Sequence, residues 1–200
     1  MAVPFRSRTT DELVARKPEP EAFASLQRAP LHIVLADVRG LANVGLIFRL
    51  CDNLRAGHLW LCGITGHPPY EGDPREPEIA ARCDREIRRT AVMAVPFVPW
   101  SYRGDALDVV RERKAAGDRI VVVEQAEGAL PLHEAPLDGP VTLVLGHERT
   151  GVDPAILAEA DVALELPVYG MANSINVAMT AAIVGYELVR RTGGFSLEPL

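Results

Sequence analysis

The sequence predicts an α/β protein in which a parallel sheet is flanked by helices. Short apolar runs alternate with helical segments along most of the chain, which is the pattern of the strand-helix-strand units that build parallel sheets. The run IVVVEQ at 120–125 is rich in β-branched residues, as expected for a strand buried on both faces. No internal repeat interrupts the pattern, so we expect one domain at 31–200 that follows a short arm at 1–30.

The first half of the chain indicates two strands with a helix between them. LHIVLA at 31–36 and HLWLCG from residue 58 are apolar and short. Asn43 can cap the intervening helix, which we expect to run to about Ala56 and to stop at Gly57. The loop at 66–77 is rich in proline and glycine, so we expect it to be exposed and mobile. A polar helix should follow to about Thr90.

The next elements are also readable from local pattern. The prolines in VMAVPFVPW suggest a short or edge strand. An amphipathic helix is expected at 104–116, and the strand at 120–125 follows it. From residue 141 to 191 the order is strand, glycine-bounded loop, short helix, strand, loop and long helix. The loops after Val123, Leu145 and Leu166 should therefore meet at the carboxyl ends of parallel strands, where ligands bind in such sheets.

The last helix is apolar on almost every side. Ser174 is the expected N-cap, because its hydroxyl can accept hydrogen bonds from amides of the first turn. Ala178, Ala181, Ala182 and Gly185 share one face, where another backbone can approach closely. Such a helix should be buried. An ordinary core helix would explain this pattern, and so would a helix that is covered by a second subunit.

Composition limits the class of protein. The 200 residues are 48% hydrophobic and 24% charged, which is typical of a globular domain. No apolar run is long enough to cross a bilayer and the start has no apolar signal-peptide core, so we expect a cytoplasmic protein without a membrane partner. The cysteines, Cys51, Cys62 and Cys83, lack metal-ligand spacing. We predict reduced packing thiols and no metal site.

Charge argues against a protein that coats nucleic acid by bulk attraction, because the net charge is −6. Local basic clusters remain, and they can contact phosphates or simply form solvated surface. One cluster lies in the predicted polar helix and one in the arm; their members are Arg82, Arg85, Arg88 and Arg89, and Arg6, Arg8, Arg16 and Lys17.

Three motifs resemble those of the SpoU/TrmH RNA ribose methyltransferases, a family of the SPOUT superfamily. The first is NVGLIFR at 43–49 with Asp52 beyond it, the second is GHERTG at 146–151, and the third is LPVYGMANSINV at 166–177. All three occur in the family's order, which makes the resemblance specific. It implies a SPOUT-type fold with a deep C-terminal trefoil knot, in which Gly146, Gly151 and Gly170 would permit close backbone crossings.

The resemblance also implies a cofactor, S-adenosylmethionine. Val123, Gly146 and Leu166 would contact it largely through backbone atoms, and Ser174 would close the pocket. The chain has no dinucleotide-type glycine motif, Walker loop, zinc-protease helix or serine nucleophile elbow. A pocket of backbone groups with apolar walls suits a cofactor that carries no phosphate. Without the motifs, Val123 and Leu166 would simply be strand ends.

The expected catalytic groups are Arg49, Asn43, Glu148, Ser174 and Asn176. Arg49 matches the family's catalytic arginine, and it would act either as the base that takes the 2′-hydroxyl proton or as a cation that stabilises the developing alkoxide. Glu148 is expected to orient Arg49 by a carboxylate-guanidinium pair. Asn43 is either a site residue or only a helix cap, and Asn176 is placed to hydrogen-bond across the site.

The resulting hypothesis is an RNA 2′-O-ribose methyltransferase that depends on S-adenosylmethionine and acts as a homodimer. A tRNA substrate is favoured and rRNA is the alternative. A non-catalytic RNA-binding dimer with the same fold is a second hypothesis, and a small-molecule methyltransferase is a third. The sequence departs from the family at Leu50-Cys51, where Thr-Ala is common, and at His147, where Asn is frequent.

Overall fold

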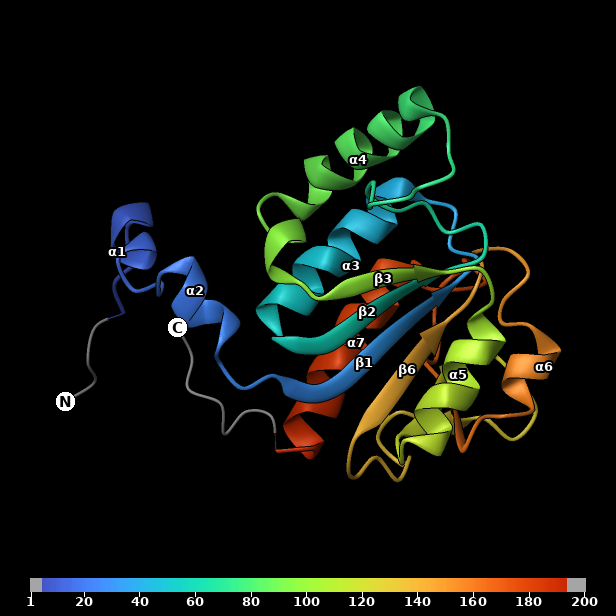
Figure 1. Cartoon of the computed structure of the whole chain (residues 1–200). Helices are drawn as coiled ribbons and strands as arrows, with labels where there is room; N and C mark the ends of the chain where they lie inside the picture. The colour runs from blue at the N-terminus through green and yellow to red at the C-terminus, as the bar shows by residue number, and fades with distance from the viewer. Residues whose placement is uncertain (1–4, 194–200) are drawn as a thin grey trace.

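A parallel sheet forms the centre of the molecule (Figure 1). The computed structural model describes residues 5–193, and within them the sheet has seven strands in the order β3-β2-β1-β6-β4-β7-β5. Every strand pairing in it is parallel. The predicted fold class is therefore confirmed. The strands are β1 (Ala29–Ala36), β2 (Ala56–Cys62), β3 (Trp100–Arg103), β4 (Arg119–Val123), β5 (Leu130–Pro131), β6 (Val141–Leu145) and β7 (Val162–Glu165).

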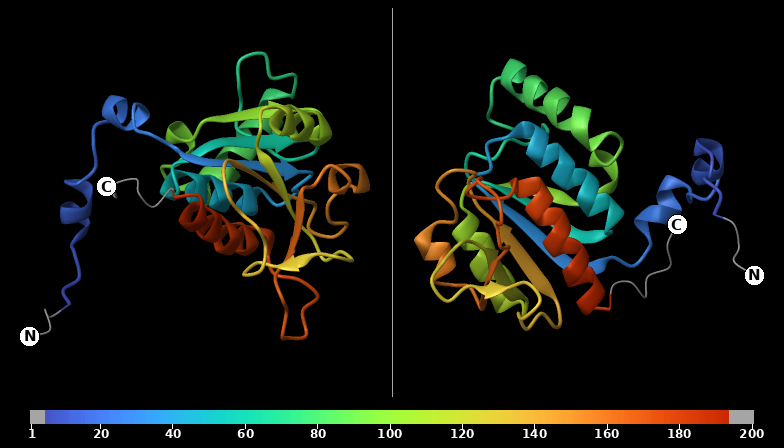
Figure 2. Two further views of the ribbon diagram at one scale, coloured as in Figure 1. Left: turned by 90° about the horizontal axis from the view of Figure 1, so that it is seen from below. Right: turned by 180° about the vertical axis from the view of Figure 1, so that it is seen from behind.

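Helices cover both faces of the sheet (Figure 2). The helical elements are α1 (Thr10–Val14), α2 (Pro20–Ala24), α3 (Leu41–Asn53), α4 (Pro77–Ala91), the 3₁₀ turn η1 (Val95–Phe97), α5 (Ala106–Ala115), α6 (Pro154–Leu157) and α7 (Val177–Arg191). Residues of α3 and α7 pack into the larger core cluster, and residues of α5 and α6 pack into a second cluster on the opposite face. α4 lies outside α3 (Figure 2).

A glycine sets the close packing of α4 on α3. A Cβ atom at Gly45 would lie 2.1 Å from the Thr90 hydroxyl oxygen and 2.2 Å from the Ile87 carbonyl oxygen. The Thr90 hydroxyl donates a hydrogen bond to the Ala42 carbonyl at 2.9 Å. Because the two backbones are this close, α3 is held in place from its outer side, and the first predicted motif lies on a well-packed helix.

The structure corrects several local predictions in the first half of the chain. α3 begins at Leu41 with Gly40 as its N-cap and ends at Asn53, so Asn43 does not cap it and Gly57 does not stop it. Gly57 lies inside β2, where an added Cβ would be 2.8 Å from the His32 ring. The arm contains two short helices where one was expected. Pro96 lies in η1, and the edge strand follows at Trp100, directly after Pro99.

The loop at 66–77 is more firmly held than predicted. His67 is buried and its ring lies 4.3 Å from the ring of Tyr102, centroid to centroid. Arg75 donates to both carboxylate oxygens of Asp73 and to the carbonyl of His67. The pairing with Arg75, opposed by burial, lowers the pKa of Asp73 to about 2. The expectation of a mobile loop is therefore not supported by these contacts.

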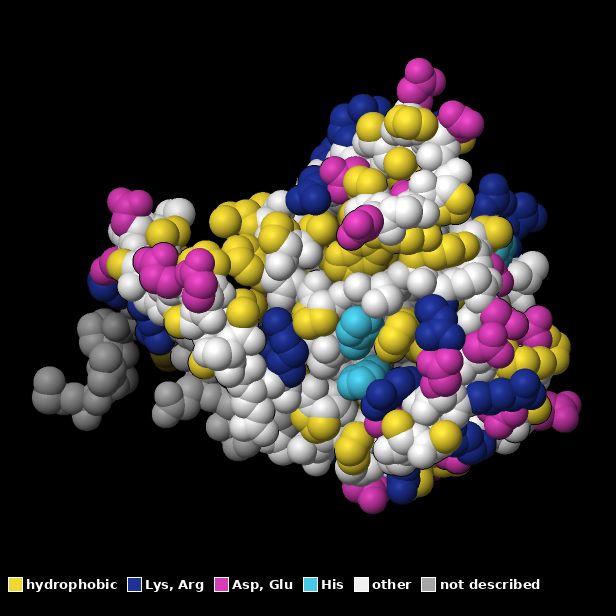
Figure 3. All heavy atoms as spheres, in the orientation of Figure 1, with side chains coloured by type: hydrophobic (Ala, Val, Ile, Leu, Met, Phe, Trp, Pro, Cys, Tyr) yellow, Lys and Arg dark blue, Asp and Glu magenta, His cyan; other side chains and the backbone are white. Residues whose placement is uncertain are grey.

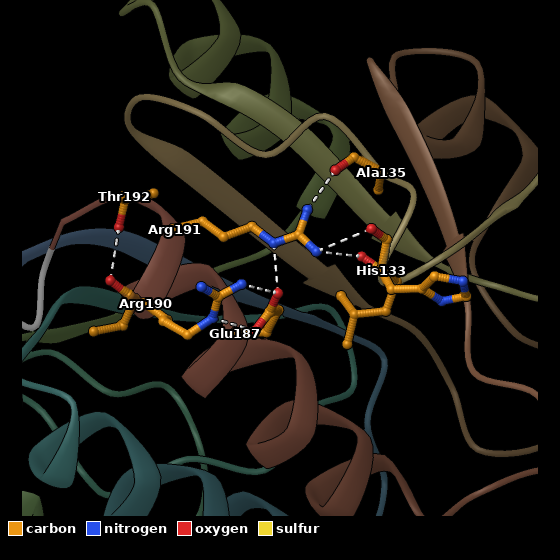
Figure 4. Close-up of polar contacts among 8 residues, drawn as sticks. His133, Ala135, Glu187, Arg190, Arg191 and Thr192 are labelled. Atoms are coloured by element: carbon orange, nitrogen blue, oxygen red, sulfur yellow. Dashed lines mark hydrogen bonds and ion pairs between the residues drawn. The ribbon is translucent and has the colours of Figure 1, made fainter.

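The C-terminal end of α7 is attached to the segment after β5 (Figure 4). The Arg191 guanidinium donates to the Ala135 carbonyl at 2.7 Å and to the Leu132 carbonyl at 3.1 Å. Arg190 and Arg191 also donate to Glu187, and these bonds lower the pKa of Glu187 to about 2 against a smaller effect of burial. α7 is thus fixed at the end that lies away from the motifs.

The three cysteines lie in the interior of the protein. Cys51, Cys62 and Cys83 are free and buried, which confirms the prediction of packing thiols. Burial raises the pKa of the Cys62 thiol to about 12. Among residues 5–193 there is no helix with the length and apolar character that crossing a membrane requires.

Candidate active site

A cavity of about 660 Å³ opens at the carboxyl ends of β4, β6 and β7. This is the edge where the sequence placed the meeting of three loops. Its walls combine apolar strand ends with loop backbone and a few polar side chains, which is the usual composition of a small-molecule site. All the residues expected to contact the cofactor line it, namely Val123, Gly146, Leu166 and Ser174.

Two glycines let the backbone fold tightly on one side of this cavity. A Cβ at Gly146 would lie 2.5 Å from the Gly151 carbonyl carbon, and one at Gly151 would lie 2.2 Å from a Glu124 carboxylate oxygen. Gly151 also has φ +73°, a backbone conformation that favours glycine. The expectation of a close crossing fails at Gly170, because an added Cβ there would meet nothing within 4 Å.

Residues that the sequence reasoning missed tie the cavity loops together. Both carboxylate oxygens of Glu124 accept backbone amides, from Val152 at 2.8 Å and from Gln125 at 3.0 Å. The Gln125 side-chain amide donates to the Asn173 carbonyl at 2.8 Å. Their position in the sequence could have predicted this role, because they directly follow a fully apolar strand. Polar residues at the carboxyl end of a parallel strand lie at the edge of the sheet where ligands bind.

A chain of hydrogen bonds joins the three sequence motifs at the mouth of the cavity. The Asn43 side-chain amide donates to the Glu148 carboxylate at 3.0 Å, and the Asn43 oxygen accepts from the Asn176 amide at 3.1 Å. The Asn176 oxygen accepts from the Ala178 amide at 2.9 Å, in the first turn of α7. Residues more than a hundred positions apart in sequence are thus held together by directional bonds.

Glu148 is the acceptor at one end of this chain. Its carboxylate also accepts the backbone amides of Arg39 at 3.1 Å and Gly40 at 2.9 Å. Burial opposes ionisation, but these amide bonds and the one from Asn43 outweigh it and hold the pKa of Glu148 below its usual value. Glu148 is therefore ionised at neutral pH, and it fixes the loop between β1 and α3 against the loop after β6.

The predicted pair between Glu148 and Arg49 is wrong, because the carboxylate is occupied by two amides and Asn43. The Arg49 side chain is exposed on α3 and makes no hydrogen bond or ion pair with any residue of the described range 5–193. It lies six residues beyond Asn43, which is about 9 Å along a helix axis. A guanidinium in that position is available to a ligand.

The N-terminus of α7 also differs from the prediction. Ser174 is not the cap; it is exposed and lines the cavity. Asn176 is the N-cap, and its oxygen accepts the amides of Ala178 and Met179. The expectation that Asn176 bonds across the site agrees with its contact to Asn43. One side chain therefore both starts the helix and connects it to the first motif.

His147 organises the turn that carries Glu148. Its Nδ1 accepts the amides of Arg149 at 3.0 Å and Thr150 at 3.2 Å. Its backbone forms a two-bond bridge with Gly151, with N–O distances of 3.0 and 2.9 Å. Because Nδ1 accepts these amides, the ring hydrogen lies on Nε2.

Comparison with known proteins assigns the family. The chain matches the SpoU rRNA Methylase family over residues 30–186, and it therefore belongs to that family. It is 42% identical over 79 residues to a 23S rRNA (guanosine(2553)-2'-O)-methyltransferase of Bacillus subtilis and 36% identical over 80 residues to a tRNA (guanosine(18)-2'-O)-methyltransferase of Aquifex aeolicus. Each match covers 40% of this chain, and the matches cover 32% and 38% of those two relatives, so the chain aligns with only about a third of the length of each.

A solved structure shows the same architecture over most of the chain. An AdoMet-bound rRNA methyltransferase of Sinorhizobium meliloti superposes with a TM-score of 0.68 at 25% sequence identity. The superposition covers 84% of this chain and 59% of that one. The parallel sheet with its flanking helices is thus shared with a known rRNA methyltransferase well beyond the motifs themselves.

Proposed function

We propose that this protein transfers a methyl group from S-adenosylmethionine to a ribose 2′-oxygen of RNA. The observation that carries the proposal is the hydrogen-bond chain Glu148–Asn43–Asn176, which lies at the mouth of the cavity and joins all three motifs. Arg49, on the same helix as Asn43, extends an unpaired guanidinium from that helix. The relatives named above are 2′-O-methyltransferases of rRNA and tRNA, which supports the same reaction class here.

The cavity suits S-adenosylmethionine as the cofactor. Its volume of about 660 Å³ lies within the range of small-molecule sites. Val123 and Leu166 supply apolar wall, and the Gly146 backbone can approach a ligand because no side chain covers it. Ser174 and Thr180 add hydroxyl groups to the lining. The bound cofactor would supply an activated methyl group on sulfur.

The protein's own contribution is positioning and electrostatic stabilisation. Arg49 stays cationic, because a guanidinium is a poor base at neutral pH, and it orients the RNA phosphate next to the target ribose. When bound, the cofactor would supply its methyl group to the ribose 2′-oxygen with loss of its carbon–sulfur bond, and the proton of that hydroxyl would pass to solvent. Arg49 stabilises the negative charge that develops on that oxygen. Asn43 and Glu148 hold the adjoining loop in place.

Methyl transfer from labelled S-adenosylmethionine to unmodified tRNA and rRNA tests the proposal. We expect a 2′-O-methylated nucleoside from the tRNA pool and a loss of at least about a hundredfold in Arg49→Ala, since one transition-state contact is worth about that much. Arg111→Ala is the matched control, because Arg111 is paired with Glu159 on the opposite face of the sheet. Methylation of rRNA without methylation of tRNA would identify rRNA as the substrate instead. Binding of cofactor and RNA without transfer would indicate a non-catalytic RNA-binding dimer.

We also propose that the active form is a homodimer. α3 and α7 pack against each other, and both expose large apolar side chains: Leu46 is 43% exposed, Met179 61% and Ile183 45%. α3, α4 and α7 lie side by side on the back of the molecule (Figure 2). Exposed apolar side chains on two adjacent helices are the kind that a partner covers, and a second copy of this chain fits the predicted need of α7 for burial.

Oligomeric state in solution tests the dimer. Light scattering after gel filtration should give twice the mass of the 200-residue chain for wild type. Ile183→Glu should give a monomer, because a carboxylate would have to be buried in the interface. Ile64→Glu is the control, since Ile64 is 64% exposed and follows β2 instead of lying on α3 or α7. A monomeric wild type at micromolar concentration would contradict the proposal.

Finally, we propose that the C-terminal segment passes through the preceding loop as a trefoil knot. The tight contact of Gly146 with Gly151 and the adjacency of the loops that line the cavity support this arrangement. α7 also returns from the β7 side of β4 to pack on α3, β1 and β6. Tracing the chain in an experimental electron-density map would test it.

A further inference from the structure

Most arginine side chains of this protein are already engaged. The hydrogen-bonded or ion-paired ones are Arg6, Arg28, Arg75, Arg88, Arg89, Arg103, Arg111, Arg113, Arg119, Arg190 and Arg191. Figure 3 shows the result over α5 and α6, where basic and acidic side chains lie intermixed. A smaller set makes no side-chain hydrogen bond or ion pair with residues 5–193: Arg8, Arg16, Arg39, Arg49, Arg82, Arg85 and Arg149.

Of these unpaired arginines, Arg149 lines the cavity, and Arg39 and Arg49 lie in segments that Glu148 and Asn43 connect to it. The backbone amide of Arg39 binds the Glu148 carboxylate, so its side chain starts directly beside that group. Arg149 is the next residue after Glu148, and Arg49 lies on α3 beyond Asn43. All three side chains are exposed. Neither Arg39 nor Arg149 was among the expected site residues, although Arg149 lies within the second motif.

The nearby carboxylates form no ion pair with these three guanidinium groups, and each accepts backbone amides instead. Glu148 accepts the amides of Arg39 and Gly40. Glu124 accepts amides with both oxygens, and Asp37 accepts the Ile64 amide at 2.9 Å. In a chain with a net charge of −6, these three exposed guanidinium groups therefore keep their hydrogen-bond donors available to a ligand near the cavity.

We infer that Arg39 and Arg149 bind RNA phosphates on either side of the target ribose, next to the phosphate held by Arg49. This inference rests on the proposed function. A guanidinium matches a phosphate with two parallel hydrogen bonds, which an ammonium cannot do. Contacts of this kind position the strand without reading its bases. They should appear as a salt-dependent contribution to RNA affinity in a protein whose net charge repels RNA.

The slope of affinity against salt measures such contacts directly. The probe is an unmodified, in vitro transcribed tRNA pool, titrated with protein between 50 and 300 mM KCl in the presence of S-adenosylhomocysteine. Each phosphate contact contributes about 0.7–0.9 to the slope of log K against log salt. Arg39→Ala and Arg149→Ala should each reduce the slope by about that amount, and the double variant by about twice as much. At 0.1 M KCl each single loss corresponds to about sixfold weaker binding.

Three controls distinguish direct phosphate contacts from a general effect of substitution. Arg39→Lys should retain the slope, because the charge remains. Arg111→Ala should leave the slope unchanged, since Arg111 is already paired with Glu159. The melting temperatures of Arg39→Ala and Arg149→Ala should equal that of wild type, because the side chains removed make no hydrogen bond or ion pair with residues 5–193.

Unchanged slopes in Arg39→Ala and Arg149→Ala, in a protein whose wild type methylates RNA, would overturn this inference and leave the proposed function standing. An unchanged slope together with weaker S-adenosylmethionine binding in Arg149→Ala would assign that residue to the cofactor instead, since it lines the cavity. A wild type that neither binds nor methylates RNA would remove both proposals.

Discussion

Replacing Glu148 by glutamine tests whether the loop before α3 is held by a carboxylate. The side chain keeps its size and loses its charge. In wild type, one oxygen accepts the Gly40 amide and Asn43, and the other accepts the Arg39 amide. In Glu148→Gln one of these positions becomes an NH₂ group. The better orientation keeps the Gly40 and Asn43 bonds and places this NH₂ against the Arg39 N–H, so that one donor faces another.

The expected loss of stability in Glu148→Gln follows from the hydrogen bonds that the substitution removes or weakens. A hydrogen bond to a charged group contributes about 1.5–3 kcal/mol, and one such bond is removed while two become neutral. Because Glu148 is exposed to solvent, we take the lower end and expect a loss of about 1.5 kcal/mol in the free energy of unfolding. For a domain of this size that is a fall of about 3–6 °C in melting temperature. Methyl transfer should fall more steeply, because Asn43 loses its charged partner.

The pH dependence of stability tests independently whether the Glu148 carboxylate stabilises the folded protein. The pKa of Glu148 is lower in the folded protein than its ordinary value of 4.5, so the contribution of the carboxylate is present above pH 4.5 and is lost as pH falls through the folded pKa. The difference in stability between wild type and Glu148→Gln should therefore shrink in acid. Glu159→Gln is the control, because Glu159 forms surface pairs with Arg111 and Lys114 that contribute little.

Calorimetry from pH 3.5 to 7 and the methyl-transfer assay measure both effects. If Glu148→Gln melts like wild type at pH 7 and retains full activity, the carboxylate does not hold the loop and the hydrogen-bond chain has no functional role.

Three further predictions concern the neighbouring loops and the sheet. Gly146→Ala should lower S-adenosylmethionine affinity more than tenfold, as measured by calorimetric titration, because its Cβ would lie 2.5 Å from Gly151; Gly104→Ala, with nothing within 4 Å of the added atom, should bind normally. His147→Asn should keep the melting temperature within about 2 °C of wild type, because an amide oxygen can accept the same two amides, whereas His147→Ala should lower stability by about 1–2 kcal/mol. Burial, with the nearby positive groups, lowers the pKa of His58 to about 4. As pH falls, His58 is therefore protonated in the unfolded chain before it is protonated in the folded protein, which favours unfolding. The free energy of unfolding of wild type, measured by urea titration, should fall by about 1–2 kcal/mol relative to His58→Gln between pH 6.5 and pH 4. This magnitude allows for the exposed part of the ring.

The order of elements was predictable because it depends on local pattern. The β-branched run at 120–125 predicted β4 to within two residues, and β6 begins at residue 141, where a strand was expected. The meeting of loops after parallel strands followed from the sheet geometry alone. The order of the strands across the sheet did not, because several orders satisfy the same alternation, and the two-residue β5 has no periodic pattern to detect.

Helix ends were predicted less well, because capping residues compete. Ser174 and Asn176 have equal capping chemistry, and their sequence positions differ by only two residues. The choice depends on Asn43, which bonds Asn176 and lies 133 residues earlier in the chain. The expected pair of Glu148 with Arg49 failed for a related reason. Two backbone amides already held in a folded loop bind a carboxylate with less entropy loss than a long, flexible side chain.

The hydrogen-bond chain explains why the same residues can be mistaken for simple helix caps. Asn176 caps α7 with its oxygen and bonds Asn43 with its amide, so the start of α7 and the position of α3 are set by one side chain. Asn43 in turn bonds Glu148, which binds the loop that leads into α3. A displacement of any of these three segments would break bonds in the other two. The cavity mouth should therefore behave as one unit, and substitutions within the chain should show coupling energies in double-mutant cycles instead of additive losses.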